Sequence, residues 1–79
     1  MNLHSGMYVV VGDSRRTLDI GILRNATEGG AWWVWWTWAN KATVWTADLT
    51  AAFFESVEDA EDEADSRWIK LKPQVRVSR

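Results

Sequence analysis

The side chains that could perform chemistry are few in this chain, and nearly all of them are carboxylates. His4 is the only histidine and there is no cysteine, so neither a thiol nucleophile nor a thiolate metal site can form. The sequence contains neither a phosphate-binding loop nor a nucleophile elbow. Carboxylates work as general acid and base in a cleft that tunes them, whereas here they lie in one polar run. We therefore predict that the protein is not an enzyme.

The acidic run is the strongest charge feature of the sequence. Residues 48–65 contain eight acids and no base, whereas residues 1–47 carry a net charge of +1 and residues 66–79 a net charge of +5. A helix cannot wrap its carboxylates around an ion as a bent loop does, so we expect no metal and no cofactor. Like charges four residues apart on a helix cost about 0.2–0.5 kcal/mol per pair, so an acidic face favours a basic partner. A plain solvated face is the alternative. The candidate residues for binding this partner are Glu58, Asp59, Asp62, Glu63 and Asp65.

The second feature is a segment rich in tryptophan. Residues 31–38 predict a strand, because aromatic and β-branched residues favour strands and a helix of this composition would have no polar face. A turn at Asn40 and Lys41 then returns the chain to another strand at residues 43–47, which places Trp36 opposite Trp45. We predict that the core side of this pair is the face formed by Trp32, Val34, Trp36, Trp38 and Trp45.

The opposite face of the same strands carries Trp33, Trp35 and Val44. A single helix can cover only one face of a sheet, so we expect this face to be exposed. Large exposed apolar patches mark interfaces, and tryptophan is enriched among the residues that dominate binding. Trp33 and Trp35 are therefore the candidate aromatic residues for binding a partner. The alternative is that a closed barrel or a homodimer buries these rings.

Two strands are predicted before the tryptophan segment. Residues 7–11 are apolar and largely β-branched, which is typical of a strand. Residues 17–23 place Leu18, Ile20 and Ile22 on one face, a period of two that indicates a half-buried strand. The two strands are predicted to form a hairpin.

One helix is predicted at residues 56–67. Ser56 is a suitable N-cap, acids fill the first turns, and Arg67 near the end suits the helix dipole. Alternating apolar and basic residues then predict a last strand at 68–71. The predicted fold class is α+β: a mostly antiparallel sheet of four to five strands with one helix packed on one face, in the order β-β-β-β-α-β.

The 79 residues are predicted to form a single domain, 1–79, with residues 1–6 frayed and residues 73–79 as a weakly ordered tail. The first residues lack the basic start and apolar run of a signal peptide, and the tryptophan segment is far shorter than the ~20 residues of a membrane span. We expect a cytoplasmic protein that does not bind membranes. Direct nucleic-acid binding relies on distributed Lys and Arg, which the acidic run opposes.

Residues 53–60, Phe-Phe-Glu-Ser-Val-Glu-Asp-Ala, follow the pattern aromatic-x-Ser-x-Glu-x-Ala, in which a strand runs into a capped helix. With this junction, its size, its acidity, its lack of cysteine and its α+β order, the chain resembles the small proteins of phages and mobile elements, a group that includes anti-CRISPR inhibitors. The resemblance implies a stoichiometric inhibitor in the host cytoplasm. Such an inhibitor occupies a site on a host complex, often one that normally holds nucleic acid.

The leading functional hypothesis is a non-catalytic inhibitor that binds a basic host protein or complex through the acidic helix face and exposed tryptophans. A second hypothesis is a tryptophan platform that binds a sugar, a peptide or a methylated lysine. A third is a structural subunit whose tryptophans are buried in a homo-oligomer. Direct binding of nucleic acid by the tryptophan strand is the least favoured, because of the acidic run.

Overall fold

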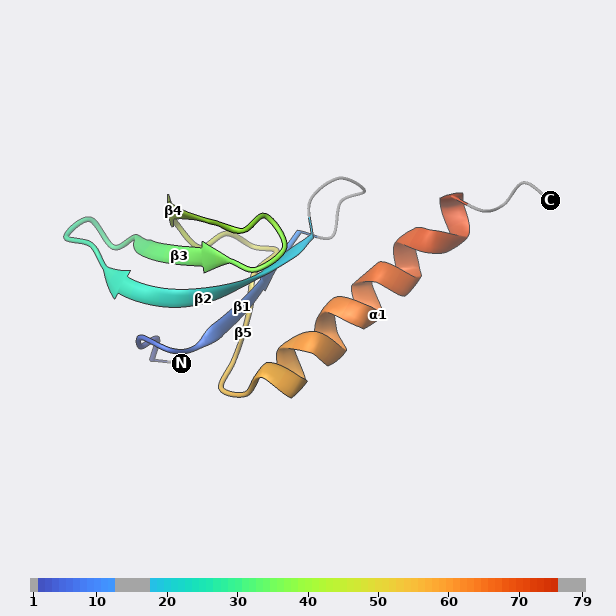
Figure 1. The fold of residues 1–79 in the computed structure, drawn as a ribbon, viewed down its shortest axis with the longest axis horizontal. Helices are drawn as coiled ribbons and strands as arrows, with labels where there is room; N and C mark the ends of the chain where they lie inside the picture. Colours follow the sequence, from blue (N-terminus) through green and yellow to red (C-terminus); the bar gives the residue numbers. More distant parts are fainter. Residues whose placement is uncertain (1, 13–17, 76–79) are drawn as a thin grey trace.

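The structure of the protein is a computed structural model, which describes residues 2–12 and 18–75, and the side chains of these residues up to Lys70. Five short strands are followed by one long helix (Figure 1). In chain order the elements are β1 (Tyr8–Val11), β2 (Asp19–Ala26), β3 (Trp32–Trp36), β4 (Lys41–Trp45), β5 (Ala52–Phe54) and α1 (Val57–Val75).

The strands form one antiparallel sheet in the order β4-β3-β2-β1-β5. β1, β2 and β3 each pair with the next strand along the chain, and β5 returns to pair with the other side of β1. The predicted hairpin of the first two strands is present, with Val10 opposite Ile20. The predicted fold class is therefore confirmed: the protein is α+β, with an antiparallel five-stranded sheet and one helix packed against a face of it.

The order of the last two elements differs from the prediction. Residues 68–71, predicted as a final strand, belong to the second half of α1. The fifth strand is instead the short segment Ala52–Phe54, which precedes the helix. Alternating apolar and basic residues are compatible with either structure over so few positions. Trp68 lies four residues after Ala64, which is buried on the helix, and so also fits the spacing of a helix that continues.

α1 begins as predicted, and its described contacts with the sheet lie between its start and Arg67. The hydroxyl of Ser56 accepts the backbone N–H of Asp59 at 3.2 Å, which caps the first turn. Ala60 and Ala64 are the buried residues in the part of the helix whose side chains are described, and both lie in its first half. The second half runs away from the sheet (Figure 1).

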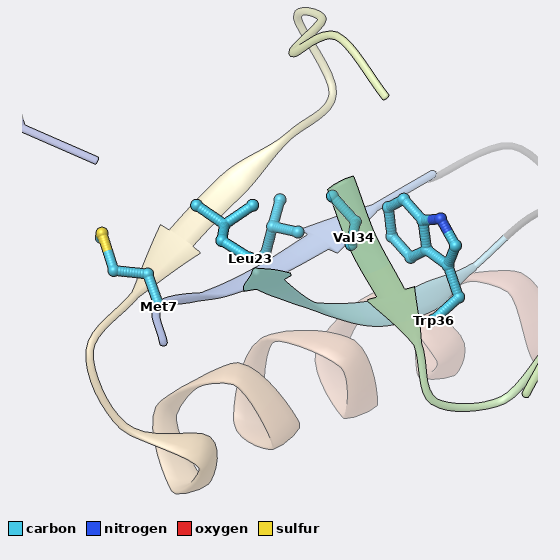
Figure 2. Packing of buried hydrophobic residues seen from close by; sticks show 5 residues of the cluster. Met7, Leu23, Val34 and Trp36 are labelled. Atoms are coloured by element: carbon cyan, nitrogen blue, oxygen red, sulfur yellow. The ribbon is translucent and has the colours of Figure 1, made fainter. Parts of the chain in front are cut away.

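Two apolar clusters lie on opposite faces of the sheet. On the face toward α1, Val10 and Ile20 pack with Ala60 and Ala64, whose small side chains allow the helix to approach closely. Figure 2 shows the labelled side chains of the second cluster on the side of the sheet that faces away from the helix. This second cluster, which we call the inner core, consists of Met7, Val9, Leu23, Val34 and Trp36.

The inner core is covered by the sheet itself, because the sheet curls until side chains of its two edge strands meet. Trp45 of β4 and Phe53 of β5 pack against this core, and their ring centroids lie 6.1 Å apart. Trp36 contacts Trp45 edge-on, with centroids 5.8 Å apart and an interplanar angle of 85°. The Nε1–H of Trp36 donates to the hydroxyl of Thr43 at 2.8 Å. The core side of the tryptophan strand is thus predicted correctly, but the curled sheet covers it and α1 does not.

Gly21 allows this packing on β2. It lies opposite Trp36 in the β2–β3 ladder, and it is buried. A Cβ atom at this position would come within 2.4 Å of the Val34 side chain and 2.7 Å of the Trp36 ring. The space that a side chain would fill is therefore taken by its neighbours across the ladder, as when an aromatic ring covers a glycine in a sheet.

The turn between β3 and β4 spans residues 37–40, and not the predicted pair Asn40 and Lys41. The Asp19 carboxylate, at the start of β2, accepts the backbone N–H groups of Trp38 at 2.8 Å and of the next residue at 3.0 Å. Asn40 adopts a φ of 59°, a left-handed conformation that Asn tolerates better than most residues. The turn between β3 and β4 is therefore longer than predicted, and the side chain of Asp19 in β2 stabilises it.

The longer turn changes which tryptophans face each other. Trp32 lies opposite Trp45, whereas the sequence predicts Trp36 in that place. The shift is four positions along β3, and an even shift leaves every side chain on its predicted face. Trp38 is the exception, because it lies in the turn and is 56% exposed. Its predicted place on the core side is wrong.

The start of the chain is bonded to the sheet. The hydroxyl of Ser5 donates to the carbonyl of Arg24 at 2.6 Å, and the N–H of Gly6 donates to the carbonyl of Leu23 at 2.8 Å. Both residues belong to the segment 1–6 that the sequence predicts to be frayed. Of the predicted tail, residues 73–75 lie in α1 and residues 76–79 lie outside the described residues.

Candidate functional site

The acidic residues predicted to bind a partner lie together on the first half of α1. Glu58, Asp59, Asp62 and Asp65 are exposed, and we call these four the acidic surface. None of them forms an ion pair with another described residue. Glu58 and Asp62 are four residues apart, so their like charges face each other on the helix and repel. Among the described residues, no cation therefore neutralises the acidic surface.

Glu63, the fifth predicted acid, has a contact inside the fold. Its carboxylate accepts a hydrogen bond from Nε of Arg67 at 2.7 Å. The Arg67 side chain is only 12% exposed, and its Nη1 donates to the carbonyl of Thr50 at 2.8 Å. Glu63 therefore orients an arginine that ties α1 to the segment between β4 and β5. This position distinguishes it from the four acids of the acidic surface.

The predicted aromatic residues lie on β3. Trp33 is 46% exposed and stands opposite Val44, which is 52% exposed. Trp35 stands opposite Ala42 and is half-buried. We call these four residues the uncovered sheet face. Trp35 also pairs with Ile22 of β2, so this face is on the same side of the sheet as α1.

The two groups of candidate residues lie on elements that do not touch. α1 contacts β1, β2 and β5, and among the described residues it makes no contact with β3 or β4. The structure thus gathers the acids on one helix and gathers Trp33 and Trp35 on one strand. It does not combine the two groups into one cluster.

Two exposed apolar residues on α1 were missed as candidates. Trp68 is 49% exposed and Ile69 is 62% exposed, both in the half of the helix that leaves the sheet. The sequence analysis placed both residues in a predicted strand at 68–71. A helix continued past residue 67 would instead have placed Trp68 one turn after Ala64, which is buried.

One pair of titratable side chains interacts closely. The Nε2 atom of His4 lies 2.9 and 3.0 Å from the two carboxylate oxygens of Glu55. The hydrogen bond to Glu55, with a smaller contribution from the Ser5 carbonyl, raises the pKa of His4 above its ordinary value of 6.5. Both side chains are mostly exposed, at 55% and 69%. Their role is to tie the start of the chain to the junction between β5 and α1.

Within residues 2–12 and 18–75, no cluster of three or more His, Asp or Glu side chains is placed to hold a metal ion. In the same residues, no helix combines the length and apolar character that crossing a membrane requires. The chain matches no protein-family model, and neither a curated protein nor a solved structure is significantly similar to it.

Proposed function

We propose that this protein acts without catalysis, by binding a basic protein or complex through the acidic surface of α1. The observation that carries the proposal is that the four carboxylates of the acidic surface, with Glu61 beside them, are exposed on one helix without an ion-pair partner among the described residues. Each like-charged pair four residues apart costs about 0.2–0.5 kcal/mol, and Lys or Arg of a partner would relieve this repulsion. A single sign of charge also accelerates encounter with an oppositely charged surface.

The specific form that we propose is a stoichiometric inhibitor of a nucleic-acid-handling complex of the CRISPR-Cas type. Proteins that hold nucleic acid line their channels with Lys and Arg, which neutralise phosphates. A helix with a row of carboxylates carries negative charge, as the phosphates of nucleic acid do, so the Lys and Arg of such a channel attract it in the same way. The resemblance to small inhibitors of phages and mobile elements supports the same reading. The acidic surface lies on the first half of α1, which packs on the sheet through Ala60 and Ala64, so the fold holds its carboxylates in a fixed arrangement (Figure 1).

The test is a pull-down with the tagged protein from lysates of candidate hosts, followed by mass spectrometry. We expect a nucleic-acid-handling complex to be retained near 0.1 M salt and released near 1 M, where charge attraction is screened over about 3 Å. An excess of the nucleic acid that this complex binds should also displace the protein. Retention that is insensitive to both salt and nucleic acid would contradict the proposal.

Two matched variants separate charge from shape. Glu58→Lys/Asp62→Lys/Asp65→Lys reverses three charges of the acidic surface, and Glu58→Gln/Asp62→Asn/Asp65→Asn removes them with nearly the same shape. We expect the first to abolish retention and the second to weaken it at least tenfold. Glu28→Lys changes an exposed acid in the β2–β3 turn and should retain the partner. If reversal of the three acids left binding unchanged, the acidic surface would not be the site.

A second candidate function is a ligand platform on the uncovered sheet face. The observation that favours it is the exposed ring of Trp33 beside the exposed side chain of Val44. Tryptophan faces attract cations such as methylated lysine by about 0.5–2 kcal/mol. Titration of a sugar, peptide and methyl-lysine panel should change the fluorescence of the native protein and not that of Trp33→Ala. An unchanged signal across the panel would remove this candidate.

A further inference from the structure

The sheet and the helix each leave one apolar surface without a partner. β3 and β4 carry the uncovered sheet face, over which no described part of α1 lies. α1 continues past Arg67, the last described residue that bonds to the rest of the fold, and exposes Trp68 and Ile69. We call residues 68–75 the distal half of α1. The uncovered sheet face therefore has no helix packed on it, and the distal half of α1 has no sheet to pack on.

These two surfaces agree in size. β3 and β4 are neighbouring strands of five residues each, so the face that they form is about 10 Å wide and about 17 Å long. The distal half of α1 has eight residues and is about 12 Å long and about 10 Å across. One half-helix would therefore cover the two strands, at the spacing of about 10 Å that packed layers adopt.

Their chemistry also agrees. None of the four residues of the uncovered sheet face is charged. The acidic run ends at Asp65, and the distal half of α1 contains no Asp or Glu; its charged residues are Lys70 and Lys72, which would lie at the rim of the contact. The contact would pair Trp33 and Val44 with Trp68 and Ile69. An apolar centre depleted of charge is typical of the interfaces that homodimers form. A basic partner, by contrast, would find its complement on the acidic surface.

The two surfaces do not meet within one chain, because α1 packs on β1, β2 and β5 and its distal half runs away from the sheet (Figure 1). We propose that the protein forms a two-fold symmetric dimer in which the distal half of α1 of each copy packs on the uncovered sheet face of the other. Both copies then use the same two surfaces, so the assembly closes. The partner's helix would continue the helix layer that α1 already forms on this side of the sheet.

The exposed apolar side chains supply the centre of such an interface and not its whole area. A standard interface buries about 800 Å² per partner, and in homodimers about 65% of it is apolar. Trp33 and Trp68 are each close to half exposed, so together they leave about 200 Å² of aromatic surface in water. Val44 and Ile69, which are each more than half exposed, add aliphatic area. This inference stands apart from the proposed binding of a basic partner, and either can fail alone.

The absence of cysteine makes a direct test possible. A chain carrying Val44→Cys is mixed with a tagged chain carrying Ile69→Cys and oxidised mildly. The proposed dimer brings positions 44 and 69 of different copies together, so we expect the mixed disulfide in at least tenfold excess over a control mixture. The control replaces Val44→Cys with Leu49→Cys, since Leu49 is fully exposed and outside both surfaces. A yield no higher than the control, or a product linking only position 44 to position 44, would overturn the proposal.

Analytical ultracentrifugation of the unmodified chain gives the second measurement. We expect a concentration-dependent dimer that Trp33→Glu and, separately, Ile69→Glu convert to a monomer. Both positions are exposed, so circular dichroism should show that both variants remain folded. Leu49→Glu should leave the dimer intact, as should the triple lysine variant of the acidic surface. A chain that stays monomeric up to about 100 μM would also overturn the proposal.

Discussion

The rings of Trp45 and Phe53 lie 6.1 Å apart, centroid to centroid, although they belong to the two opposite edge strands of one sheet. The planes are inclined by 55°. β4 and β5 are not neighbours in the ladder, so side chains and not strand pairing bring these edges together. Both rings cover the inner core that includes Trp36. The contact between Trp45 and Phe53 therefore covers the inner core on the face of the sheet opposite α1, where no described helix lies.

We predict that this contact contributes measurably to stability. Trp45→Ala and Phe53→Ala should each lower the free energy of unfolding by about 2–3 kcal/mol, less than for a fully buried ring because both are only partly buried. The double variant should show a coupling of about 0.5–1.5 kcal/mol in denaturant unfolding. Leu49→Ala, which removes a fully exposed side chain, should change stability by less than about 0.5 kcal/mol. Additive effects of the two ring deletions would mean that the rings do not interact.

Gly21 gives the second prediction, with a matched control in the same chain. Gly21→Ala forces a methyl group against Val34 and the Trp36 ring, so it should destabilise the fold by about 1–3 kcal/mol. Gly29→Ala adds the same methyl group in a turn where no atom lies within 4 Å. It should be neutral within about 0.5 kcal/mol. Equal thermal midpoints for both variants would show that Trp36 does not lie over Gly21.

The third prediction concerns the turn that sets the register of β3 and β4. Asp19→Ala removes the acceptor for two backbone N–H groups, and we expect a loss of about 1–2 kcal/mol because the site is only partly buried. The amide of Trp38 should exchange with solvent faster in this variant. Glu28→Ala, which removes an exposed carboxylate in the other turn, serves as the control. Unchanged exchange at Trp38 would contradict the bond.

The fourth prediction is a dependence of stability on pH. The folded-state pKa of His4 is raised above its ordinary value, so protonated His4 stabilises the fold. This contribution is fully present below pH 6.5 and is lost as the pH rises through the raised pKa. Below pH 6.5, His4→Gln should therefore be less stable than the native chain. Well above the raised pKa of His4, the two proteins should be equally stable. In an NMR titration, Glu55→Gln should return the pKa of His4 toward 6.5. A native pKa at or below 6.5 would contradict the ion pair.

Parts of this fold could be predicted because they depend on local patterns. The period of two at Leu18, Ile20 and Ile22 identified β2 and the face that it turns toward the helix. The same period sorted the tryptophans, so Trp36 was placed in the core and Trp33 on the exposed face. The face of the sheet that a side chain occupies depends only on whether its position in the strand is odd or even. The faces of Trp33 and Trp36 were therefore predicted correctly, although the predicted register between β3 and β4 was wrong by four positions.

Other parts depend on contacts between distant segments and could not be predicted. The turn at residues 37–40 is stabilised by Asp19, which precedes it by about twenty residues and is an unremarkable polar residue in the sequence. β5 has three residues, too few for any period to be visible. The helix packs on β1, β2 and β5 and not on the tryptophan strands, and the curled sheet covers the inner core on the opposite face. The curl involves a contact between Trp45 and Phe53, whose strands are not neighbours in the sheet, so no local pattern predicts it.

The pairing of β5 with β1 also has a consequence for how fast the chain folds. β1 to β4 are joined by segments of four to seven residues, so their pairing closes small loops. β5 must instead find β1 across the whole of that meander, since Tyr8 pairs with Phe54, 46 positions later. Non-local pairing of this kind slows folding, because the entropy of closing the loop is lost before its contacts form. Docking of β5 should therefore be the late event in refolding, and the amides of β5 should gain protection after those of the β1–β2 hairpin.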